Sequence, residues 1–228
     1  GVGLYAGNSL YRWKNLSAIA TLDGNWVKTT KDQSGIINKG MVDIWGGSTT
    51  KSIIGLLAKF GTLENNGTDG KGIVAVDHGI AMMATDGSTI ENKGGAKVIA
   101  TGKTDSSNRG SGNPASNEPK ATGENYGIVG ISDTGYTYNI DPQGDLDNSV
   151  SIDHEGSSIY AAGDLAVGIY AGNSGTGKDK VTINYKNSSG GTTGIDVRNN
   201  KANDDSRGVG IALVNRTGTN GGTITLDG

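Results

Sequence analysis

A chain of 228 residues that contains 40 glycines and a single phenylalanine has little apolar volume per residue, which favours a thin repetitive architecture over a thick globular core. Its 23 acidic and 20 basic side chains are nearly balanced, which argues against a nucleic-acid-binding surface or a polybasic membrane patch. Because cysteine is absent, disulfides, thiolate metal sites and cysteine nucleophiles are excluded.

The N-terminal segment begins with a phrase that the chain uses twice. Residues 3–9 read Gly-Leu-Tyr-Ala-Gly-Asn-Ser, and residues 168–174 read Gly-Ile-Tyr-Ala-Gly-Asn-Ser. A second phrase, Thr-Leu-Asp-Gly, occupies both residues 21–24 and residues 225–228. Two phrases shared by distant parts of the chain indicate divergence from one repeated unit.

The three tryptophans, Trp13, Trp26 and Trp45, all lie in the first fifth of the chain. Exposed indoles would form a surface that stacks on sugars or binds a protein. The alternative is that they pack beneath a loop or against a neighbouring coil. These three residues are therefore candidates for ligand binding.

From residue 36 onward a short phrase recurs, with a branched aliphatic residue, an asparagine two places later and a glycine two places after that. It begins at Ile36, Leu63 and Ile90, a step of 27 residues taken twice, and it returns at Ile152 with histidine in the asparagine position. A constant step of this size is typical of repeat proteins. We interpret each phrase as an inward-pointing strand residue followed by a turn, since Asn and Gly tolerate positive φ angles.

Other short apolar segments, bounded by glycine and aspartate, predict further β-strands. They lie at residues 53–57, 72–76, 79–84, 126–131, 157–171, 181–185, 194–197 and 208–214. No segment carries the 3.6-residue apolar stripe of a long helix. The chain is therefore predicted to be all β.

A right-handed parallel β-helix, or β-solenoid, with projecting loops explains both the strands and the period. Successive coils lie about 4.8 Å apart, so that equivalent residues stack into columns. Seven or eight coils would give a rod about 35 Å long. Asn38, Asn65 and Asn92 should then form a ladder in which each side-chain amide bonds to the next. We expect residues 1–228 to form one segment of this helix.

A polar insertion, at about residues 101–125, interrupts the regular pattern. Residues 103–120 contain no large apolar side chain, so this stretch should project from one coil as a loop. The loop is the first candidate for partner contact, with Arg109 and Glu118 as candidate ligand-binding residues. The alternative is a solvated insertion that binds nothing.

The sequence offers few candidates for catalysis. His78 and His154 each follow an aspartate in the sequence. Such Asp and His side chains could act as the general acid or base of a sugar-cleaving site, if they lay on one face of the coil. The simpler interpretation is that His154 occupies the asparagine position of the repeated phrase. The pair Asp204-Asp205 is a poor catalytic dyad, because adjacent strand residues point to opposite faces. We expect no catalytic residue, no bound metal and no cofactor.

With its Gly-Leu/Ile-Tyr-Ala-Gly-Asn phrases and the Ile-x-Asn-x-Gly phrases between them, the chain resembles the passenger domains of large type V autotransporter adhesins, most closely those of fusobacteria. The resemblance implies a secreted β-helix on the bacterial cell surface, with a signal peptide and an outer-membrane translocator barrel outside this segment. It also implies attachment to host cells or other bacteria, through glycans or protein receptors, as a virulence function. It transfers no binding residue.

Three functions remain open. The favoured one is an adhesin segment whose coil supplies rigid length and whose loops supply recognition. A polysaccharide-cleaving β-helix enzyme or a phage-tail fibre would instead need carboxylates from adjacent coils within about 5 to 9.5 Å of each other. A pure spacer would need neither.

Overall fold

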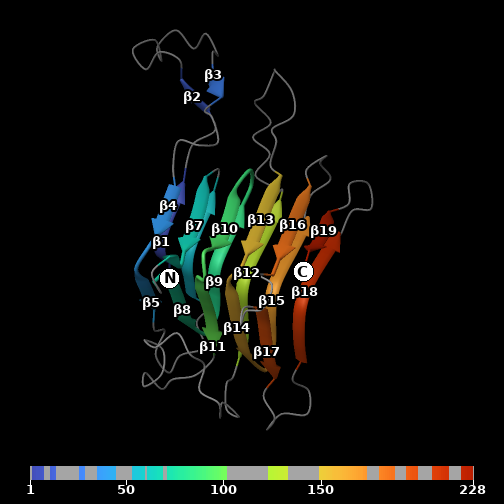
Figure 1. The fold of residues 1–228 in the computed structure, drawn as a ribbon. Helices are drawn as coiled ribbons and strands as arrows, with labels where there is room; N and C mark the ends of the chain where they lie inside the picture. The colour runs from blue at the N-terminus through green and yellow to red at the C-terminus, as the bar shows by residue number, and fades with distance from the viewer. Residues whose placement is uncertain are drawn as a thin grey trace.

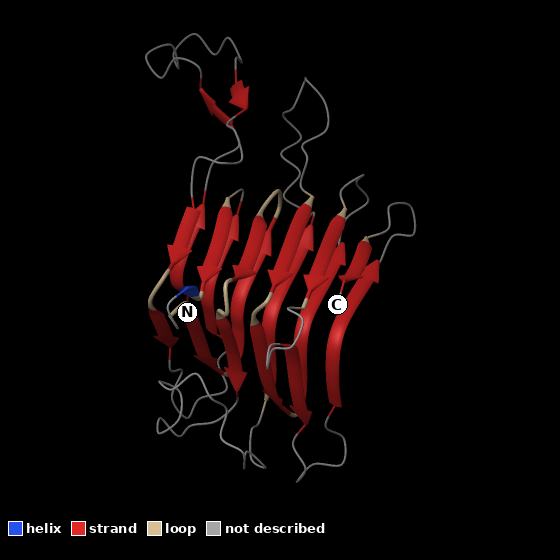
Figure 2. Ribbon diagram, in the orientation of Figure 1, coloured by secondary structure: helices blue, strands red, loops and turns tan. Residues whose placement is uncertain are grey.

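The computed structural model describes most of the predicted strands and several of the turns between them. The described residues are 2–7, 11–13, 26–28, 35–44, 53–59, 61–68, 71–101, 123–132, 149–173, 180–187, 194–199, 207–215 and 222–227. Strands account for nearly all of these residues (Figure 2). No helix in these ranges is long and apolar enough to cross a bilayer.

All described strands except β2 and β3 form three sheets in which all neighbours are parallel (Figure 1). Sheet A contains, in spatial order, β1 (Val2–Gly7), β6 (Ile53–Lys59), β9 (Gly79–Thr85), β12 (Glu124–Ser132), β15 (Leu165–Asn173) and β18 (Arg207–Asn215). Sheet B contains β4 (Gly35–Asn38), β7 (Thr62–Asn66), β10 (Thr89–Lys93), β13 (Val150–Glu155), β16 (Val181–Lys186) and β19 (Thr223–Asp227). Sheet C contains β5 (Met41–Ile44), β8 (Ile73–Asp77), β11 (Lys97–Thr101), β14 (Ser158–Gly163) and β17 (Gly194–Asn199).

The chain visits sheets B, C and A in turn and then repeats the circuit, which confirms the predicted parallel β-helix. The described strands make five turns of three strands each, from β4–β6 to β16–β18, with β1 before them and β19 after them. This is fewer than the seven or eight coils expected. The reason is that later turns are longer: Asn92 and His154 are 62 residues apart, yet β10 and β13 are adjacent strands.

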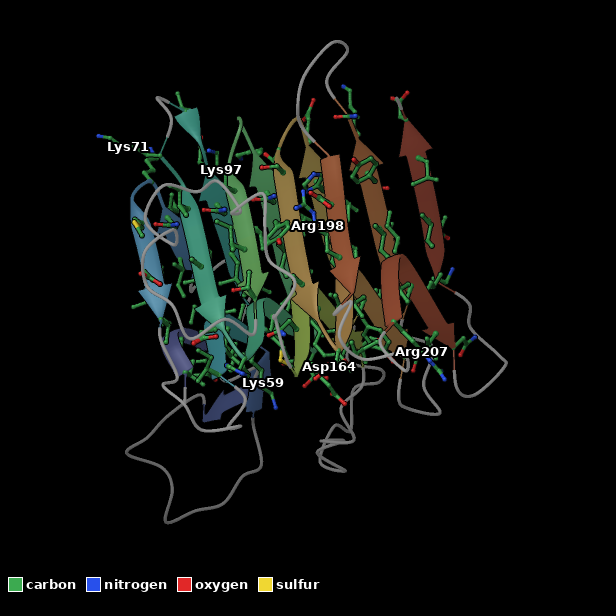
Figure 3. All side chains as sticks on the ribbon, turned by 90° about the horizontal axis from the view of Figure 1, so that it is seen from below. Lys59, Lys71, Lys97, Asp164, Arg198 and Arg207 are labelled. Carbon is green, nitrogen blue, oxygen red and sulfur yellow. The ribbon has the colours of Figure 1, made fainter. Side chains whose placement is uncertain are left out.

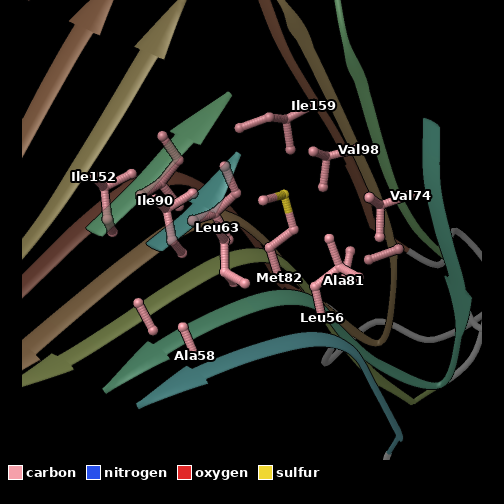
Figure 4. Close-up of a cluster of buried hydrophobic side chains, with 14 of the residues drawn as sticks. Leu56, Ala58, Leu63, Val74, Ala81, Met82, Ile90, Val98, Ile152 and Ile159 are labelled. Atoms are coloured by element: carbon pink, nitrogen blue, oxygen red, sulfur yellow. The ribbon is translucent and has the colours of Figure 1, made fainter. Parts of the chain in front are cut away.

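Aliphatic side chains from all three sheets meet inside the coil (Figure 4). Leu63, Ile90 and Ile152 form one column from sheet B, where they are in register and fully buried. Val74 and Val98 approach from sheet C, and further aliphatic side chains approach from sheet A. Each turn adds only a few such residues, so the core is a narrow column. This explains how a glycine-rich chain with one phenylalanine can bury a continuous core.

Sheet A bends where small residues face the interior. A Cβ atom added to Gly55 would lie 2.9 Å from Val76 Cγ1, so Gly55 points inward, and the next residue, Leu56, is also buried in the core. Two consecutive inward residues leave Ile54 and Leu57 together on the outer side of the strand. The position equivalent to Gly55 is occupied by Ala81, Gly127 and Gly168 in the following strands. Figure 4 shows these strands curving around the buried cluster.

The repeated phrase differs from the expectation in one respect. Asn38, Asn65 and Asn92 are buried strand residues, and none is among the residues with positive φ. The glycine of the phrase does turn the chain in later coils, where Gly94 and Gly156 have φ angles of 69° and 55°. The asparagine is therefore a core residue and the turn begins after it.

The predicted loop at residues 101–125 is bounded by strands at both ends. Thr101 ends β11 and Glu124 begins β12, and residues 102–122 lie outside the described residues. Two strands of a fourth, antiparallel sheet, β2 (Tyr11–Trp13) and β3 (Trp26–Lys28), lie between β1 and β4 in the sequence.

Candidate functional site

A ladder of polar side chains runs through the interior behind sheet B. The Asn38 side-chain amide donates to Asn65 Oδ1 at 2.9 Å, and the Asn65 amide donates to Asn92 Oδ1 at the same distance. The Asn92 amide then lies 3.0 Å from His154 Nδ1. Since amide N–H groups donate, His154 Nδ1 is the acceptor, and the imidazole carries its proton on Nε2, which donates to the Ser157 carbonyl at 3.0 Å. The predicted ladder is confirmed, and His154 extends it by one rung.

His154 is held as a neutral imidazole. Burial lowers its pKa from 6.5 to about 4, although the hydrogen bond to the Ser157 carbonyl acts in the opposite direction. On its other side the ring stacks on Tyr185, with centroids 5.0 Å apart and planes 3° from parallel. A residue that links two neighbouring coils and is 1 % exposed serves the fold, and its ring has no path to a substrate.

His78 occupies a different part of the coil, at the corner between β8 and β9. Its Nδ1 lies 2.9 Å from a carboxylate oxygen of Asp77, which is fully buried. The backbone of His78 has a φ of 60°, a conformation that few non-glycine residues adopt. The structure therefore does not bring His78 together with the ladder histidine, and Asp204 and Asp205 lie outside the described residues.

Carboxylates from adjacent coils do align on the outer side of sheet B, in the register Glu64, Glu91 and Asp153. Lys93 contacts both Glu64 and Glu91, and Asp153 accepts hydrogen bonds from Ser151 and Asn184. The hydrogen bond from Asn66 is the main cause of a lowered Glu64 pKa. A glycosidase needs a carboxyl group whose pKa is raised so that it can donate a proton. The pKa of Glu64 is shifted in the opposite direction.

The outer side of sheet A carries a second, unexpected feature. Its outward side chains form two columns of six residues, one from each strand, and none of the twelve is charged. The columns are Val2, Ile54, Ile80, Tyr126, Val167 and Val209, and Tyr5, Leu57, Met83, Val129, Tyr170 and Ala212. We call this surface the apolar face.

Two tyrosines lie at the centre of the apolar face. The rings of Tyr126 and Tyr170 meet edge to face, with centroids 6.3 Å apart. Tyr126 is in register with Val167, and Tyr170 is in register with Val129. Val167 and Val129 are only 4 % and 3 % exposed, so the centre of the apolar face is largely buried. Burial is the main cause of a raised Tyr126 pKa, with Glu124 contributing.

The other two outer surfaces differ from the apolar face. Sheet B presents Thr62, Thr89 and the carboxylate column, so its outer side is hydrophilic. Sheet C, which Figure 3 views with Lys97 and Arg198 labelled, also carries an apolar cluster on its outer side, but its members are buried. Of the three sheets, sheet A is therefore the one that combines apolar outward columns with solvent exposure.

None of the twelve residues that form the apolar face was selected from the sequence. Trp45, Arg109 and Glu118 lie outside the described residues. Trp13 and Trp26 pair with each other across the antiparallel strands β2 and β3. The sequence did contain a signal for the face that was missed, because adjacent apolar residues such as Ile53-Ile54 and Leu56-Leu57 leave one of each pair on the outer side.

Within the described ranges, no group of three or more histidine, cysteine or acidic side chains could hold a metal ion. Comparison of the chain with protein-family models, with curated proteins and with solved structures found no match. Function must therefore be argued from the fold and its surfaces.

Proposed function

We propose that this chain is a non-enzymatic segment of a cell-surface adhesin, in which the β-helix supplies rigid length and its surfaces and loops supply contact. The observation that carries the proposal is the apolar face of sheet A, two partly exposed columns without charge, which contrast with the threonine and carboxylate side chains on the outer side of sheet B. Exposed apolar patches of this kind are typical of interaction sites. The sequence resemblance to fusobacterial autotransporter passengers agrees with a location on the bacterial outer surface.

The fold also supports a load-bearing role. Interior strands of the stack are hydrogen-bonded to parallel neighbours on both edges, and the interior ladder adds side-chain bonds between coils. Such a rod extends by repetition and folds with only nearest-neighbour contacts. Host or bacterial glycans and protein receptors are both compatible partners, and the apolar face and the segment at residues 103–120 are the two candidate contact regions.

Attachment can be tested directly with beads coated with the chain and offered to epithelial cells and to other bacteria. Two variants separate the contact regions. The first replaces residues 103–120 with a short Gly-Ser turn, and the second is Leu57→Lys combined with Met83→Glu, which places an ion pair on the apolar face. Adhesion above that of uncoated beads, reduced by either variant, supports the proposal. Beads that attach no better than uncoated beads to any cell type would refute the attachment role.

The enzymatic alternative has less support, because the aligned carboxylates of sheet B are engaged with Lys93, Ser151 and Asn184. Turnover of any member of a polysaccharide panel, abolished by Glu64→Gln or Glu91→Gln, would favour it over adhesion.

A further inference from the structure

The direction of every hydrogen bond in the interior ladder is fixed at its first rung. The backbone N–H of Gly40 donates to Asn38 Oδ1 at 3.1 Å, so the oxygen and the nitrogen of that side chain cannot exchange places. The Asn38 amide then donates to Asn65, and each later rung must turn its oxygen toward the preceding rung. The last amide, on Asn92, therefore points its N–H group at Nδ1 of His154.

This direction leaves His154 no arrangement that accepts a second proton. Protonation would place an N–H group on Nδ1, 3.0 Å from the Asn92 amide, which is also a donor. If the Asn92 side chain turned over, its nitrogen would face the Asn65 amide, and the conflict would only move one rung along the ladder. The other ring nitrogen already donates to the Ser157 carbonyl. The closed stack therefore excludes the imidazolium form.

The charged side chains around His154 do not compensate for this exclusion. The titratable and charged residues on the strands packed around it are Glu91 and Lys93 on β10, Asp153 and Glu155 on β13, Tyr185 and Lys186 on β16, Lys97 on β11, Glu124 and Tyr126 on β12, and Tyr160 on β14. The five charged residues on sheet B each lie beside an inward residue in the sequence, so they point to the outer side, and those on sheets A and C also share the outward positions of their strands. Tyr185 alone among them has its ring against the imidazole, and burial raises its pKa, so it stays neutral in acid. None of these residues supplies a negative charge to a protonated ring.

Release of the ring requires only one corner of the coil to open. His154 is the second-last residue of β13, and the turn that follows is held by backbone hydrogen bonds from Gly156 to the next coil and from Ser158 to the preceding coil. Solvent is close, because Glu155 and Lys186 form an ion pair at this corner and both side chains are more than half exposed. Each coil of a solenoid contacts only its neighbours, so such an opening can stay local.

We propose that the turn between β13 and β14 is an acid-sensitive joint of the rod, which opens when His154 binds a proton and releases the imidazolium to solvent. The turns of the preceding coils have asparagine at the same position of the ladder, which does not titrate, so they stay closed. The joint does not depend on what the rod binds and therefore goes beyond the attachment role. In acid it gives a flexible point to a stack that is rigid at neutral pH.

Hydrogen exchange of the purified chain at pH 7 and pH 4.5 tests the proposal, with the rate of each amide divided by its rate in an unstructured peptide at the same pH. The His154 ring has a pKa of about 4 when buried and of 6.5 when released, so opening should become about 50-fold more favourable over this range. Protection of the Gly156 and Ser158 amides should fall by that factor. The equivalent amides in the asparagine coils, Gly67 and Lys97, are the matched control and should change less than about threefold.

The variant His154→Asn separates the joint from a general loosening of the stack in acid. It removes the titrating ring, so protection at Gly156 and Ser158 should no longer fall between pH 7 and pH 4.5. If the variant does not fold, NMR of the imidazole nitrogens in the wild type replaces it, and the ring should gain its second proton in step with the loss of protection. Equal falls at all four amides, unchanged protection at Gly156 and Ser158 in the wild type, or a fall there that persists in the variant or precedes ring protonation, would overturn the proposal. Each of these outcomes leaves the attachment role to its own test.

Discussion

Replacing His154 by asparagine tests the reasoning behind the interior ladder. The substitution would continue the series Asn38, Asn65 and Asn92 with a fourth amide, and it would remove a group that titrates. In the folded chain the imidazole binds a proton only below about pH 4, whereas in the unfolded chain it does so below about 6.5. Between these values the unfolded state binds more protons, so the free energy of unfolding must fall as the pH falls.

The size of this effect follows from the shift. A difference of about 2.5 pKa units corresponds to about 3 kcal/mol of stability, which is present in full above pH 6.5 and is lost by about pH 4. Protonation of Nδ1 would also place an N–H group against the Asn92 amide, two donors facing each other across a 3.0 Å contact. His154→Asn should remove this loss and leave the contributions of the carboxylates unchanged.

The assay is urea unfolding of both proteins at pH 7, 6, 5 and 4. We expect the decrease in unfolding free energy between pH 7 and pH 4 to be smaller in the variant by about 3 kcal/mol. The variant also loses the stacking of the imidazole on Tyr185, which lowers its stability equally at every pH. Comparing the pH dependence of the two proteins, rather than their stability at one pH, cancels this contribution. The reasoning fails if the two proteins have parallel pH profiles, or if NMR shows the folded His154 ring titrating near its ordinary pKa.

Three further predictions concern the same interior. Asn65→Leu removes the middle rung, so that Asn92 Oδ1 loses its donor and the Asn38 amide keeps only its bond to the Ile73 carbonyl. The free energy of unfolding should drop by about 2 to 4 kcal/mol in urea denaturation, and a change under about 0.5 kcal/mol would contradict the ladder's role. Gly127→Ala should cost about 1 to 3 kcal/mol, because the new Cβ would lie 2.6 Å from the Gly168 carbonyl oxygen; unchanged thermal stability would show that sheet A can relax there. Tyr185→Leu keeps an apolar side chain against the core and removes the ring that stacks on His154, so it should cost no more than about 1.5 kcal/mol, and complete unfolding would show that the tyrosine has another role.

The sequence determined the fold because its repeated phrase returns at a constant spacing. A phrase that recurs every 27 residues requires equivalent residues to be stacked, and stacking requires a parallel coil. For the same reason the sequence predicted that Asn38, Asn65 and Asn92 would bond to one another and that His154 would take the asparagine position. It did not predict that Tyr185 continues this column, because the phrase has changed too far there to be recognised.

The surfaces were decided only by the tertiary structure. An apolar run such as Ile53-Ile54-Gly55-Leu56-Leu57 fits a strand that is buried on both sides as well as one that is buried on a single side. Which side faces solvent depends on the inward bend at Gly55 and on whether anything covers the outside. Sheets A and C both carry outward apolar side chains, and only their packing shows that one set is buried and the other is exposed. The periodic sequence specifies which side chains lie inside each coil, whereas the solvent exposure of the outward side chains depends on how the coils and the segments around them pack.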